Sequence, residues 1–405
     1  MIRWLRPTDS RPDLQALGCI GPAWDQPHLL TWGQTSFSQR MPTAVLDPVG
    51  PVQPLPPGPS LAFDRLRFHD PLLDRSIDAQ TFLDRRLFND GLLVMHRGRV
   101  VHERYRNGLT SSDLHVVHSV SKTLTTMMVG IAVGEGRLDP MAPVAHCVPA
   151  LAALPAWSTV KLQHVLDMAS GIDCDEDYRV PDSMYWRYAR SVGYAGGGEQ
   201  AEGALAFLLA NLTRSSEPPG TRFNYASYLT NLLPLALEHS YGQPALELYA
   251  SRLFGRIGAE QRCEINVDSQ RLPIVEGQVN LTLRDLARWA SLYLHEGRSL
   301  AGEALVPPAW IEATLAATPA RLAAFTASDA SQRFPRGHYA NQCWVVDAQR
   351  RRLAMLGIHG QFAYLDLPAQ LMIVGLGSFP VQVAPLMTAS LQQLWAVVSA
   401  EVGAG

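Results

Sequence analysis

Lysine is almost absent from this chain of 405 residues. Lys122 and Lys161 are its only lysines, and arginine supplies the rest of the 34 basic side chains. The formal net charge of −3 at pH 7 predicts no basic surface for nucleic acid or for an anionic membrane. A lysine that is kept inside an apolar stretch therefore needs a chemical reason.

Other absences narrow the class of protein further. No stretch approaches the roughly 18 apolar residues of a membrane span, and the first residues lack the apolar core of a secretion signal. The cysteines are odd in number and show no metal-binding spacing. We therefore expect a soluble cytoplasmic protein with reduced thiols, no metal and no cofactor. The five cysteines are Cys19, Cys147, Cys174, Cys263 and Cys343.

Proline, in contrast, is concentrated near the start of the chain. Residues 42–59 contain seven prolines, which exclude a helix or an inner strand. We predict that residues 1–60 form an irregular arm, either flexible or wrapped over the main body. An early hairpin and late strands around a helical middle predict an α/β (α+β) domain over 61–139 and 265–405, with a helical domain over 140–264.

Local patterns place the individual elements. The C-terminal third alternates short apolar runs with turns, which is typical of antiparallel strands. Further elements follow from turn, cap and periodicity signals: a hairpin over 91–105 around Arg97-Gly98, a helix from Ser119 to Gly134 and Gly136, a helix over 225–238 bent at Pro234, a helix over 282–297 from a Thr282 cap to Gly297, and a last helix over 384–402.

The stretch "HSVSKT" places Ser119 three residues before Lys122, at the start of an uncharged helical run. Positions i and i+3 share one face of a helix, so the hydroxyl and the amine can meet. A serine in the first turn also lies beside free backbone N–H groups and the positive end of the helix dipole. These are the parts of an acyl-transfer enzyme: a nucleophile, a nearby base and donors for an oxyanion. A lysine is a poor base unless burial disfavours its charged form, and residues 123–134 carry no charge.

The spacing alone is weak evidence, because "STVK" also places Ser158 three residues before Lys161. The residues after Lys161 interleave polar and apolar side chains as in an ordinary amphipathic helix, with Ser158 or Thr159 as its cap. We therefore expect Lys161 in water. For Lys122, a buried ion pair is the structural alternative to a catalytic role.

Several segments in the same order resemble one family. "HSVSKTLTTMMVGIAVGEGRLD" is similar to the S-x-x-K helix of the serine β-lactamase and penicillin-binding-protein superfamily, and the likeness extends over roughly residues 70–400. It is strongest to class C β-lactamase-like esterases, among them the 6-aminohexanoate-dimer (nylon oligomer) hydrolases. The resemblance implies a β-lactamase/transpeptidase-like fold, with an antiparallel sheet flanked by helices and a mostly helical lobe. The other similar segments are VLDMASGIDCDEDYR (165–179), PPGTRFNYASYLTNLL (218–233), NLTLRDLARWASLYLHEG (280–297), GHYANQCWV (337–345) and LGIHGQFAYLD (356–366).

The resemblance also implies a role for each candidate residue. Ser119 would be the nucleophile that forms an acyl-enzyme, and Lys122 and Tyr225 would share the proton transfers as a coupled pair. The backbone N–H groups of Ser119 and Ile358 would form the oxyanion hole. The candidate substrate-binding residues are Tyr178, which would cover the substrate, and Ser227, His359, Gln361 and Tyr194.

Two departures from the family pattern narrow the substrate. The second motif reads Tyr225-Ala226-Ser227 where Tyr-x-Asn is usual, and a serine hydroxyl reaches less far toward a substrate amide. The third motif reads His359-Gly360-Gln361 where lactamases have a lysine, so a fixed positive charge is missing. We therefore predict a serine hydrolase that acts on carboxylic esters or linear amides.

Alternatives exist for the function and for single residues. A β-lactamase or a D-alanyl-D-alanine carboxypeptidase would use the same machinery, whereas a relative that only binds a ligand would be no enzyme. A zinc site at His115 and His118 lacks a third ligand. Tyr178 can instead be an exposed surface residue, His359 can form a hydrogen bond only within the strand layer, and Tyr194 can be a core or rim aromatic. As partners we expect a small-molecule ester or amide and neither nucleic acid nor a membrane, and a homodimer is left open.

Overall fold

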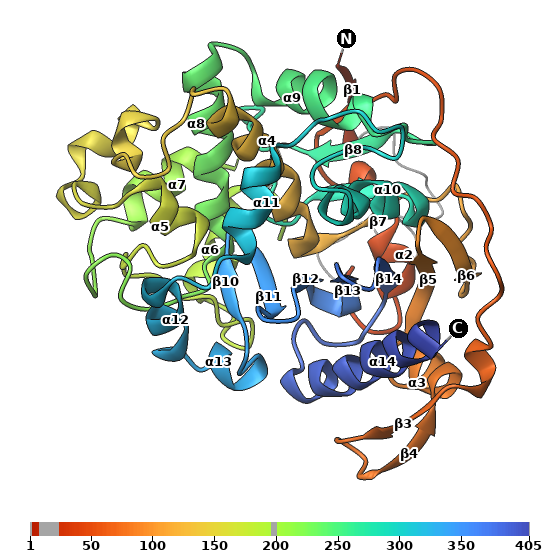
Figure 1. Cartoon of the computed structure of the whole chain (residues 1–405). Coiled ribbons are helices and arrows are strands. Elements are labelled where there is room, and N and C mark those ends of the chain that lie inside the picture. Colours follow the sequence, from red (N-terminus) through yellow and green to blue (C-terminus); the bar gives the residue numbers. More distant parts are fainter. Residues whose placement is uncertain (1, 8–23, 196–200, 405) are drawn as a thin grey trace.

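The computed structural model describes residues 2–7, 24–195 and 201–404. Its centre is a seven-stranded antiparallel sheet with the strand order β10-β11-β12-β13-β14-β5-β6. The last strand of the chain therefore pairs with an early hairpin, as Figure 1 shows, and the predicted α/β class is confirmed. The strands of this sheet are β5 Asn89–His96, β6 Arg99–Tyr105, β10 His338–Ala340, β11 Cys343–Asp347, β12 Arg352–Gly357, β13 Gln361–Asp366 and β14 Leu371–Gly377.

The predicted hairpin forms between β5 and β6. Its two turn residues, Arg97 and Gly98, both have positive φ, at 49° and 75°. Positive φ at both central residues is the signature of a type I′ turn, whose twist matches the right-handed twist of the strands. The turn therefore forms where the sequence predicts it.

The two faces of the sheet bury separate cores, because successive side chains of a strand point to opposite faces. Along β13, Leu365 joins the core that contains α10 Leu283–Leu294, and Tyr364 joins the core that contains α14 Pro385–Ala404. Trp395 of α14 stacks on the Tyr364 ring, with ring centres 4.6 Å apart. The sheet is thus covered on both sides, as Figure 1 shows for α10 and α14.

Helix α10 confirms its predicted ends. The Thr282 hydroxyl accepts a hydrogen bond from the N–H of Asp285, and the helix stops before Gly297, whose φ is +82°. The other helices outside the lobe are α2 Leu30–Gln34, α3 Ala79–Arg85, α4 Lys122–Gly134, α11 Pro308–Leu315, α12 Pro319–Thr326 and α13 Ala330–Arg333. No helix in the described ranges is both long and apolar enough to cross a lipid bilayer.

A helical lobe lies beside the sheet, on the left of Figure 1. It consists of short helices and 3₁₀ turns rather than long rods, and its core is continuous with the core under α10. The limits proposed for the two domains stay a prediction. The α-helices of the lobe are α5 Leu162–Leu166, α6 Met184–Ser191, α7 Ala204–Asn211, α8 Leu232–Tyr241 and α9 Ala245–Leu248.

Two local predictions in the lobe are wrong in part. The helix expected over 225–238 is a 3₁₀ segment, Ser227–Asn231, followed by α8, so Pro234 lies in the first turn of α8. A first turn has no hydrogen-bond partner for its N–H groups, so proline costs nothing there and no bend is needed. The cap of α5 is Lys161 itself, because α5 begins at Leu162; Ser158 lies three residues before that cap and its hydroxyl donates to the Pro155 carbonyl at 2.8 Å.

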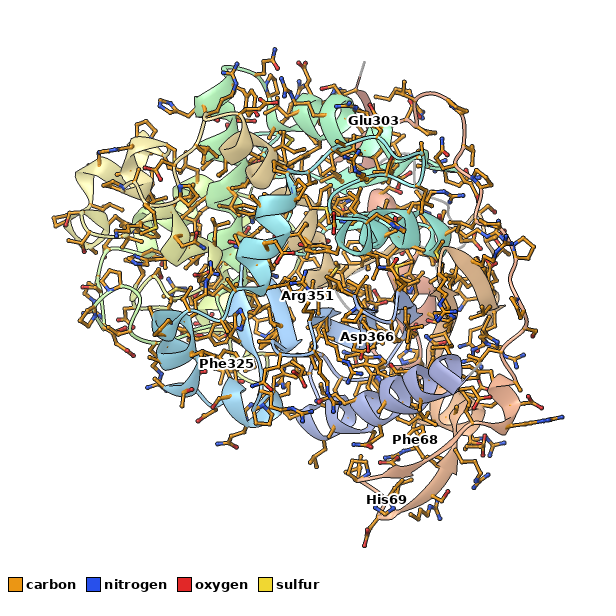
Figure 2. All side chains as sticks on the ribbon, in the orientation of Figure 1. Phe68, His69, Glu303, Phe325, Arg351 and Asp366 are labelled. Atoms are coloured by element: carbon orange, nitrogen blue, oxygen red, sulfur yellow. The ribbon has the colours of Figure 1, made fainter. Side chains whose placement is uncertain are left out.

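The described part of the N-terminal arm is wrapped over the body. Two of its segments form strands of a second sheet, with the order β1-β2-β8-β9-β7. The proline-rich stretch runs beside β6, where Gly58 N donates to Val100 O at 2.8 Å. Cys19 lies outside the described residues. The remaining strands are β1 Arg3–Leu5, β2 Thr43–Leu46, β7 His115–Val116, β8 Cys263–Asn266, β9 Val279–Leu281 and the small hairpin β3 Arg67–Asp70 and β4 Arg75–Asp78, whose Phe68 and His69 are labelled in Figure 2.

Candidate active site

The stretch around Ser119 forms a 3₁₀ turn, His118–Ser121, which leads directly into α4. A 3₁₀ turn has three residues per turn, so the side chains at positions i and i+3 lie above one another. Lys122 Nζ accordingly lies 2.8 Å from Ser119 Oγ. Ser119 is partly exposed, which leaves its hydroxyl open to a substrate.

The desolvation expected for Lys122 is observed. Its side chain is 0% exposed, and Nζ also donates to the backbone oxygen of Glu276 at 2.6 Å. The helix that begins at Lys122 carries no other charged residue and is buried over most of its length. Lys161, with the same spacing from a serine, is partly exposed and caps a short helix. Burial therefore separates the two lysines, as the sequence context suggested.

Tyr225 lies beside the same amine. Lys122 Nζ is 5.2 Å from the centre of the Tyr225 ring, and the Trp344 ring stacks on Tyr225 at 5.8 Å with an angle of 14°. Phe223 and Tyr339 complete an aromatic wall around Tyr225 and Trp344. The wall fixes the orientation of the phenol ring, since each aromatic contact restricts its rotation.

The end of β12 packs against the turn that holds the candidate nucleophile. Gly357, just before Ile358, packs so closely on the turn that a Cβ would lie 2.7 Å from Val117 O and 3.1 Å from His118 Cβ. Only glycine permits this approach. The strand end that carries Ile358 therefore lies against the turn that carries Ser119.

His359 and Gln361 follow Ile358, and both are buried. His359 Nδ1 pairs with the Phe379 carbonyl at 2.8 Å, and burial lowers the pKa of His359 to about 4. His359 is therefore neutral at pH 7. The Gln361 amide donates to Gly377 O at 2.7 Å and accepts from Gly377 N at 2.9 Å, so this side chain braces the turn from within.

Tyr194 is part of an aromatic cluster that the sequence analysis did not foresee. It is only 7% exposed and contacts two residues of the N-terminal arm, Trp24 at 5.6 Å and Phe37 at 5.8 Å between ring centres. Trp24 in turn lies 6.1 Å from both His118 and His359. The arm thus supplies a wall next to the candidate nucleophile. The part of the arm that contains Trp24 and Phe37 shows no hydrophobic periodicity, so the sequence gives no signal for this role.

Glu176 is a second residue that the sequence analysis missed. Its carboxylate accepts from the Tyr178 hydroxyl and from the Ser227 hydroxyl, the latter at 2.7 Å, and also from the Ser227 backbone N–H. Burial raises the pKa of Glu176, whereas the charge of Lys122 lowers it. Two predicted substrate-binding residues, Tyr178 and Ser227, are therefore tied to one carboxylate. The acidic run "DEDYR" contained the signal, but nothing in it distinguished Glu176 from Asp175 and Asp177 on either side.

Glu276, whose backbone oxygen accepts from Lys122, also has a buried carboxyl group. Its side chain is 5% exposed and accepts from Asn231 Nδ2 at 2.9 Å. Burial raises the pKa of Glu276 to about 7, and Asn231 and Lys122 oppose that rise. The amine of Lys122 thus lies near two carboxyl groups, those of Glu176 and Glu276. Burial favours the neutral form of each of these carboxyl groups.

His115 and His118 have protein partners rather than a shared ligand. His115 Nδ1 pairs with Val116 O and His118 Nε2 with Gln34 Oε1, both at 2.8 Å. His118 also has a positive φ of 45°, an uncommon conformation for a non-glycine residue directly before the candidate nucleophile. Within the described ranges, no group of three or more His, Cys, Asp or Glu side chains is placed to hold a metal ion.

Comparisons with known proteins identify the family. The family model described as Beta-lactamase matches residues 79–377. Over 362 residues the chain is 31% identical to a 6-aminohexanoate-dimer hydrolase of Paenarthrobacter ureafaciens, with 88% of each chain covered. The fold is similar to a solved structure provisionally assigned as a 6-aminohexanoate-dimer hydrolase from Bacillus anthracis, with a TM-score of 0.82, 20% identity and 94% and 96% of the two chains covered. It is also similar to a penicillin-binding protein from Bacillus halodurans, with a TM-score of 0.57, 15% identity and 78% and 99% covered.

These matches confirm the predicted β-lactamase/transpeptidase-like fold. They also confirm the predicted resemblance to the 6-aminohexanoate-dimer hydrolases. The family model spans well over half of the chain, and the identity to the Paenarthrobacter enzyme extends over most of both proteins. The chain therefore belongs to the Beta-lactamase family and is a hydrolase of that family.

Proposed function

We propose that this hydrolase forms an acyl-enzyme on Ser119 and cleaves carboxylic esters or linear amides. The observation that carries the proposal is the fully buried amine of Lys122, 2.8 Å from the partly exposed Ser119 hydroxyl. Burial favours the neutral form of a lysine, and a neutral amine can accept a proton. A purely structural lysine would be expected to pair with a carboxylate.

In the first half of the reaction, Ser119 Oγ attacks the carbonyl carbon of the substrate. Its proton passes to the pair formed by Lys122 and Tyr225, and the carbonyl oxygen becomes an oxyanion that Ser119 N–H and Ile358 N–H stabilise. The carbon–oxygen or carbon–nitrogen bond then breaks. The leaving alcohol or amine takes the proton from the pair by way of Tyr225.

In the second half, water attacks the acyl-enzyme. The pair accepts a proton from the water and returns it to Ser119 Oγ when the acyl bond breaks, so the carboxylic acid is released and the enzyme regains its starting state. Each half needs the same oxyanion donors. Removing one donor of this kind typically costs about a hundredfold or more in rate.

The substrate class is supported by the pattern around the site and by the relative. The Paenarthrobacter enzyme is named for the 6-aminohexanoate dimer. In this chain Ser227 stands in the place of the usual asparagine, and its hydroxyl is engaged with Glu176. His359 stands in the place of the lactamase lysine and is neutral at pH 7. Both features favour a linear amide or ester over a β-lactam.

The test is active-site labelling with a fluorophosphonate probe, followed by peptide mass spectrometry. We expect the label on Ser119, and we expect Ser119→Ala to abolish turnover of p-nitrophenyl butyrate. Ser158→Ala is the matched control, because Ser158 also precedes a lysine by three residues but belongs to an exposed turn. Label on another residue, or full turnover by Ser119→Ala, would refute the proposal. A higher rate on nitrocefin than on the ester would instead favour a β-lactamase.

A further inference from the structure

Gln34 is a buried amide of the N-terminal arm that contacts the turn of the candidate nucleophile. It is the last residue of α2, its side chain is 0% exposed, and its Oε1 accepts a hydrogen bond from His118 Nε2 at 2.8 Å. His118 directly precedes Ser119 in the chain. The arm therefore reaches the residue before the nucleophile through a single polar contact.

No second polar contact explains the amide of Gln34 within the described residues. Its Nε2 atom is buried there without a hydrogen-bond partner. A buried donor without a partner lowers stability, and an apolar side chain of similar size avoids that loss. The stability of the fold alone therefore favours an apolar residue at position 34.

The arm is attached to the body by other contacts on both sides of Gln34. Strand β2 pairs with β8 along its whole length, and Asn266 Nδ2 donates to Thr43 Oγ1 at 2.8 Å and to the Phe37 carbonyl at 3.3 Å. Leu30 and Phe37 also belong to the core that contains α10. Attachment of the arm therefore does not require the bond that Gln34 makes.

His118 needs support from its surroundings because its backbone has an uncommon conformation. Its φ of 45° turns the chain from β7 into the 3₁₀ turn, and a residue other than glycine keeps such an angle only where its neighbours impose it. The imidazole stacks on Trp24, with ring centres 6.1 Å apart, and lies perpendicular to Phe37 at 6.0 Å. A ring confined in this way can still occupy two flipped orientations about its Cβ–Cγ bond. The hydrogen bond to Gln34 selects one of them.

The same bond also selects one tautomer of the ring. Burial lowers the pKa of His118 well below its usual value, so the imidazole is neutral at pH 7. A neutral imidazole has one N–H, and the other ring nitrogen is an acceptor. Because Gln34 Oε1 can only accept, it keeps the proton on Nε2.

The conformation of His118 is transmitted directly to Ser119. The peptide unit between the two residues carries the Ser119 N–H, and the whole unit rotates with ψ of His118 because a peptide bond is planar. The same rotation moves Ser119 Oγ relative to Lys122 Nζ, which lies 2.8 Å away. His118 therefore sets the direction of both the nucleophile and one oxyanion donor of the proposed reaction.

We propose that Gln34 is a positioning residue of the active site, whose hydrogen bond to the His118 imidazole holds the turn in the shape that directs Ser119. The inference rests on the proposed function, in which Ser119 is the nucleophile and its N–H stabilises the oxyanion. Gln34 itself contacts no reacting atom. Its loss slows the chemical step rather than substrate binding, since a misplacement of reacting groups by about 1 Å can cost about a hundredfold in rate.

The experiment compares Gln34→Met with a matched control elsewhere in the arm. Methionine keeps the length of the side chain and removes the hydrogen bond to His118, whereas Thr43→Val removes the hydrogen bond from Asn266. For p-nitrophenyl butyrate we expect Gln34→Met to lower kcat about tenfold and to keep KM within about a factor of two. The rate constant for fluorophosphonate labelling of Ser119 should fall by a similar factor.

Urea unfolding of the same variants separates positioning from attachment of the arm. The midpoint of Gln34→Met should equal or exceed that of the wild type, because the unpaired amide nitrogen is removed. Thr43→Val should behave in the opposite way, with a lower midpoint and a kcat within about a factor of two of the wild-type value. Wild-type kcat in Gln34→Met, or a midpoint as low as that of Thr43→Val, would overturn the inference.

A double-mutant cycle tests the route through His118. Glycine adopts positive φ without strain, so His118→Gly keeps the turn accessible and removes the imidazole. In this background Gln34→Met should change kcat by less than about a factor of two, because its partner is already missing. An equal loss of kcat in both backgrounds would show that Gln34 acts by another route and would overturn the inference. A wild-type Ser119 that takes no label would refute the proposed function, and the inference with it.

Discussion

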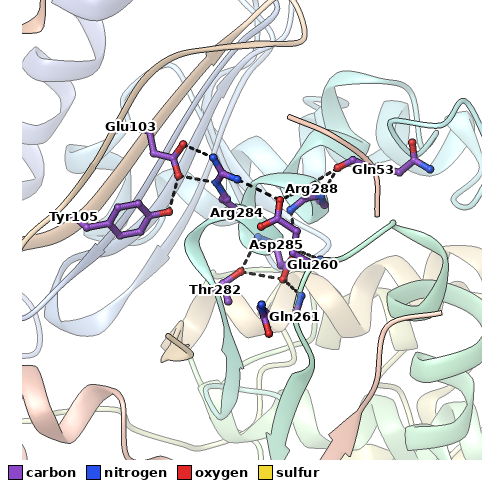
Figure 3. A network of polar contacts seen from close by, with 9 residues as sticks. All are labelled: Gln53, Glu103, Tyr105, Glu260, Gln261, Thr282, Arg284, Asp285 and Arg288. Atoms are coloured by element: carbon purple, nitrogen blue, oxygen red, sulfur yellow. Dashed lines mark hydrogen bonds and ion pairs between the residues drawn. The ribbon is translucent and has the colours of Figure 1, made fainter. Parts of the chain in front are cut away.

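Two buried cations occupy opposite kinds of surroundings in this protein. Arg288, on α10, donates to Asp285 at 3.0 Å and to the Gln53 backbone oxygen at 2.9 Å, and it also pairs with Glu260 (Figure 3). Asp285 in turn accepts from two backbone N–H groups near Glu260. Every charge in this cluster has a direct partner of opposite sign or a hydrogen bond.

Lys122 is equally buried but has no such partner. Within the described ranges, no carboxylate lies within ion-pair distance of Nζ, which contacts a hydroxyl and a backbone oxygen instead. The nearby carboxyl groups of Glu176 and Glu276 have their own neutral donors, Ser227 and Asn231. A cluster of matched ion pairs holds its charges fixed and ties segments together, whereas in the Lys122 cluster the amine and the carboxyl groups contact neutral partners.

The largest effect is expected from Lys122→Met. Removing the base of the proposed mechanism should lower kcat/KM for p-nitrophenyl butyrate by about a thousandfold or more. The free energy of unfolding should change by only about 1 kcal/mol, because a buried amine without a counter-ion contributes little to stability. Ester kinetics and urea unfolding of the same preparation measure both quantities. Lys161→Met is the control: its kcat/KM should stay within a factor of two of the wild-type value, and its free energy of unfolding should not change. A Lys122→Met enzyme that keeps its rate contradicts the mechanism.

The reverse outcome is expected from Arg288→Met. This change leaves Asp285 and Glu260 without their cation, and breaking a buried pair in this way costs about 3–5 kcal/mol of unfolding free energy. The specific activity of the remaining folded enzyme should stay close to that of the wild type, because the cluster lies on α10 and the arm rather than at Ser119. If urea unfolding shows Arg288→Met and Lys122→Met to be equally destabilised, the two clusters do not differ as described.

The sequence predicted the parts of the site that follow local rules. The spacing of Ser119 and Lys122 on one helical turn, the caps of α10 and the turn at Arg97 and Gly98 each depend on a few neighbouring residues. The family resemblance added Tyr225, which lies far away in the chain and has no local signal. Its position beside Lys122 agrees with that resemblance.

Other features could not be predicted because they depend on packing between distant segments. Glu176 stands in an acidic run that resembles an exposed loop, and only the fold brings its carboxylate onto Ser227. Trp24 belongs to a stretch without periodicity, yet it contacts Tyr194 and His118. The expected cap at Ser158 failed because α5 begins only at Leu162, so Lys161 stands at the cap position. Cap propensity alone does not say at which of several neighbouring residues a short helix begins.

A smaller effect, dependent on pH, is expected from Glu276→Gln. Burial raises the folded-state pKa of Glu276 to about 7, above the reference value of 4.5. Its contribution to stability is therefore fully present below pH 4.5 and is lost as the pH rises toward 7, by at most about 1.4 kcal/mol for each pH unit. The glutamine variant lacks this loss, so it should gain stability relative to the wild type between pH 5 and pH 8. Urea unfolding curves of the wild type and the variant at pH 5 and pH 8 test this prediction. If the free energy of unfolding changes equally in the two proteins between these pH values, Glu276 stays ionised in the folded state.

The smallest effect, and the one that sharpens the comparison most, is expected from Glu176→Gln. The amide keeps the size of the side chain but can accept only at its oxygen. An oxygen in the place of Oε1 keeps the bonds from the Tyr178 and Ser227 hydroxyls, so the bond from the Ser227 backbone N–H to Oε2 is lost. We expect about a tenfold decrease in kcat/KM for p-nitrophenyl butyrate, as for a loss of about 1.4 kcal/mol. Asp177→Asn, next to it and paired with the exposed Arg179, is the control and should leave the rate unchanged. A Glu176→Gln enzyme that keeps the wild-type rate would make Glu176 a packing residue without a part in turnover.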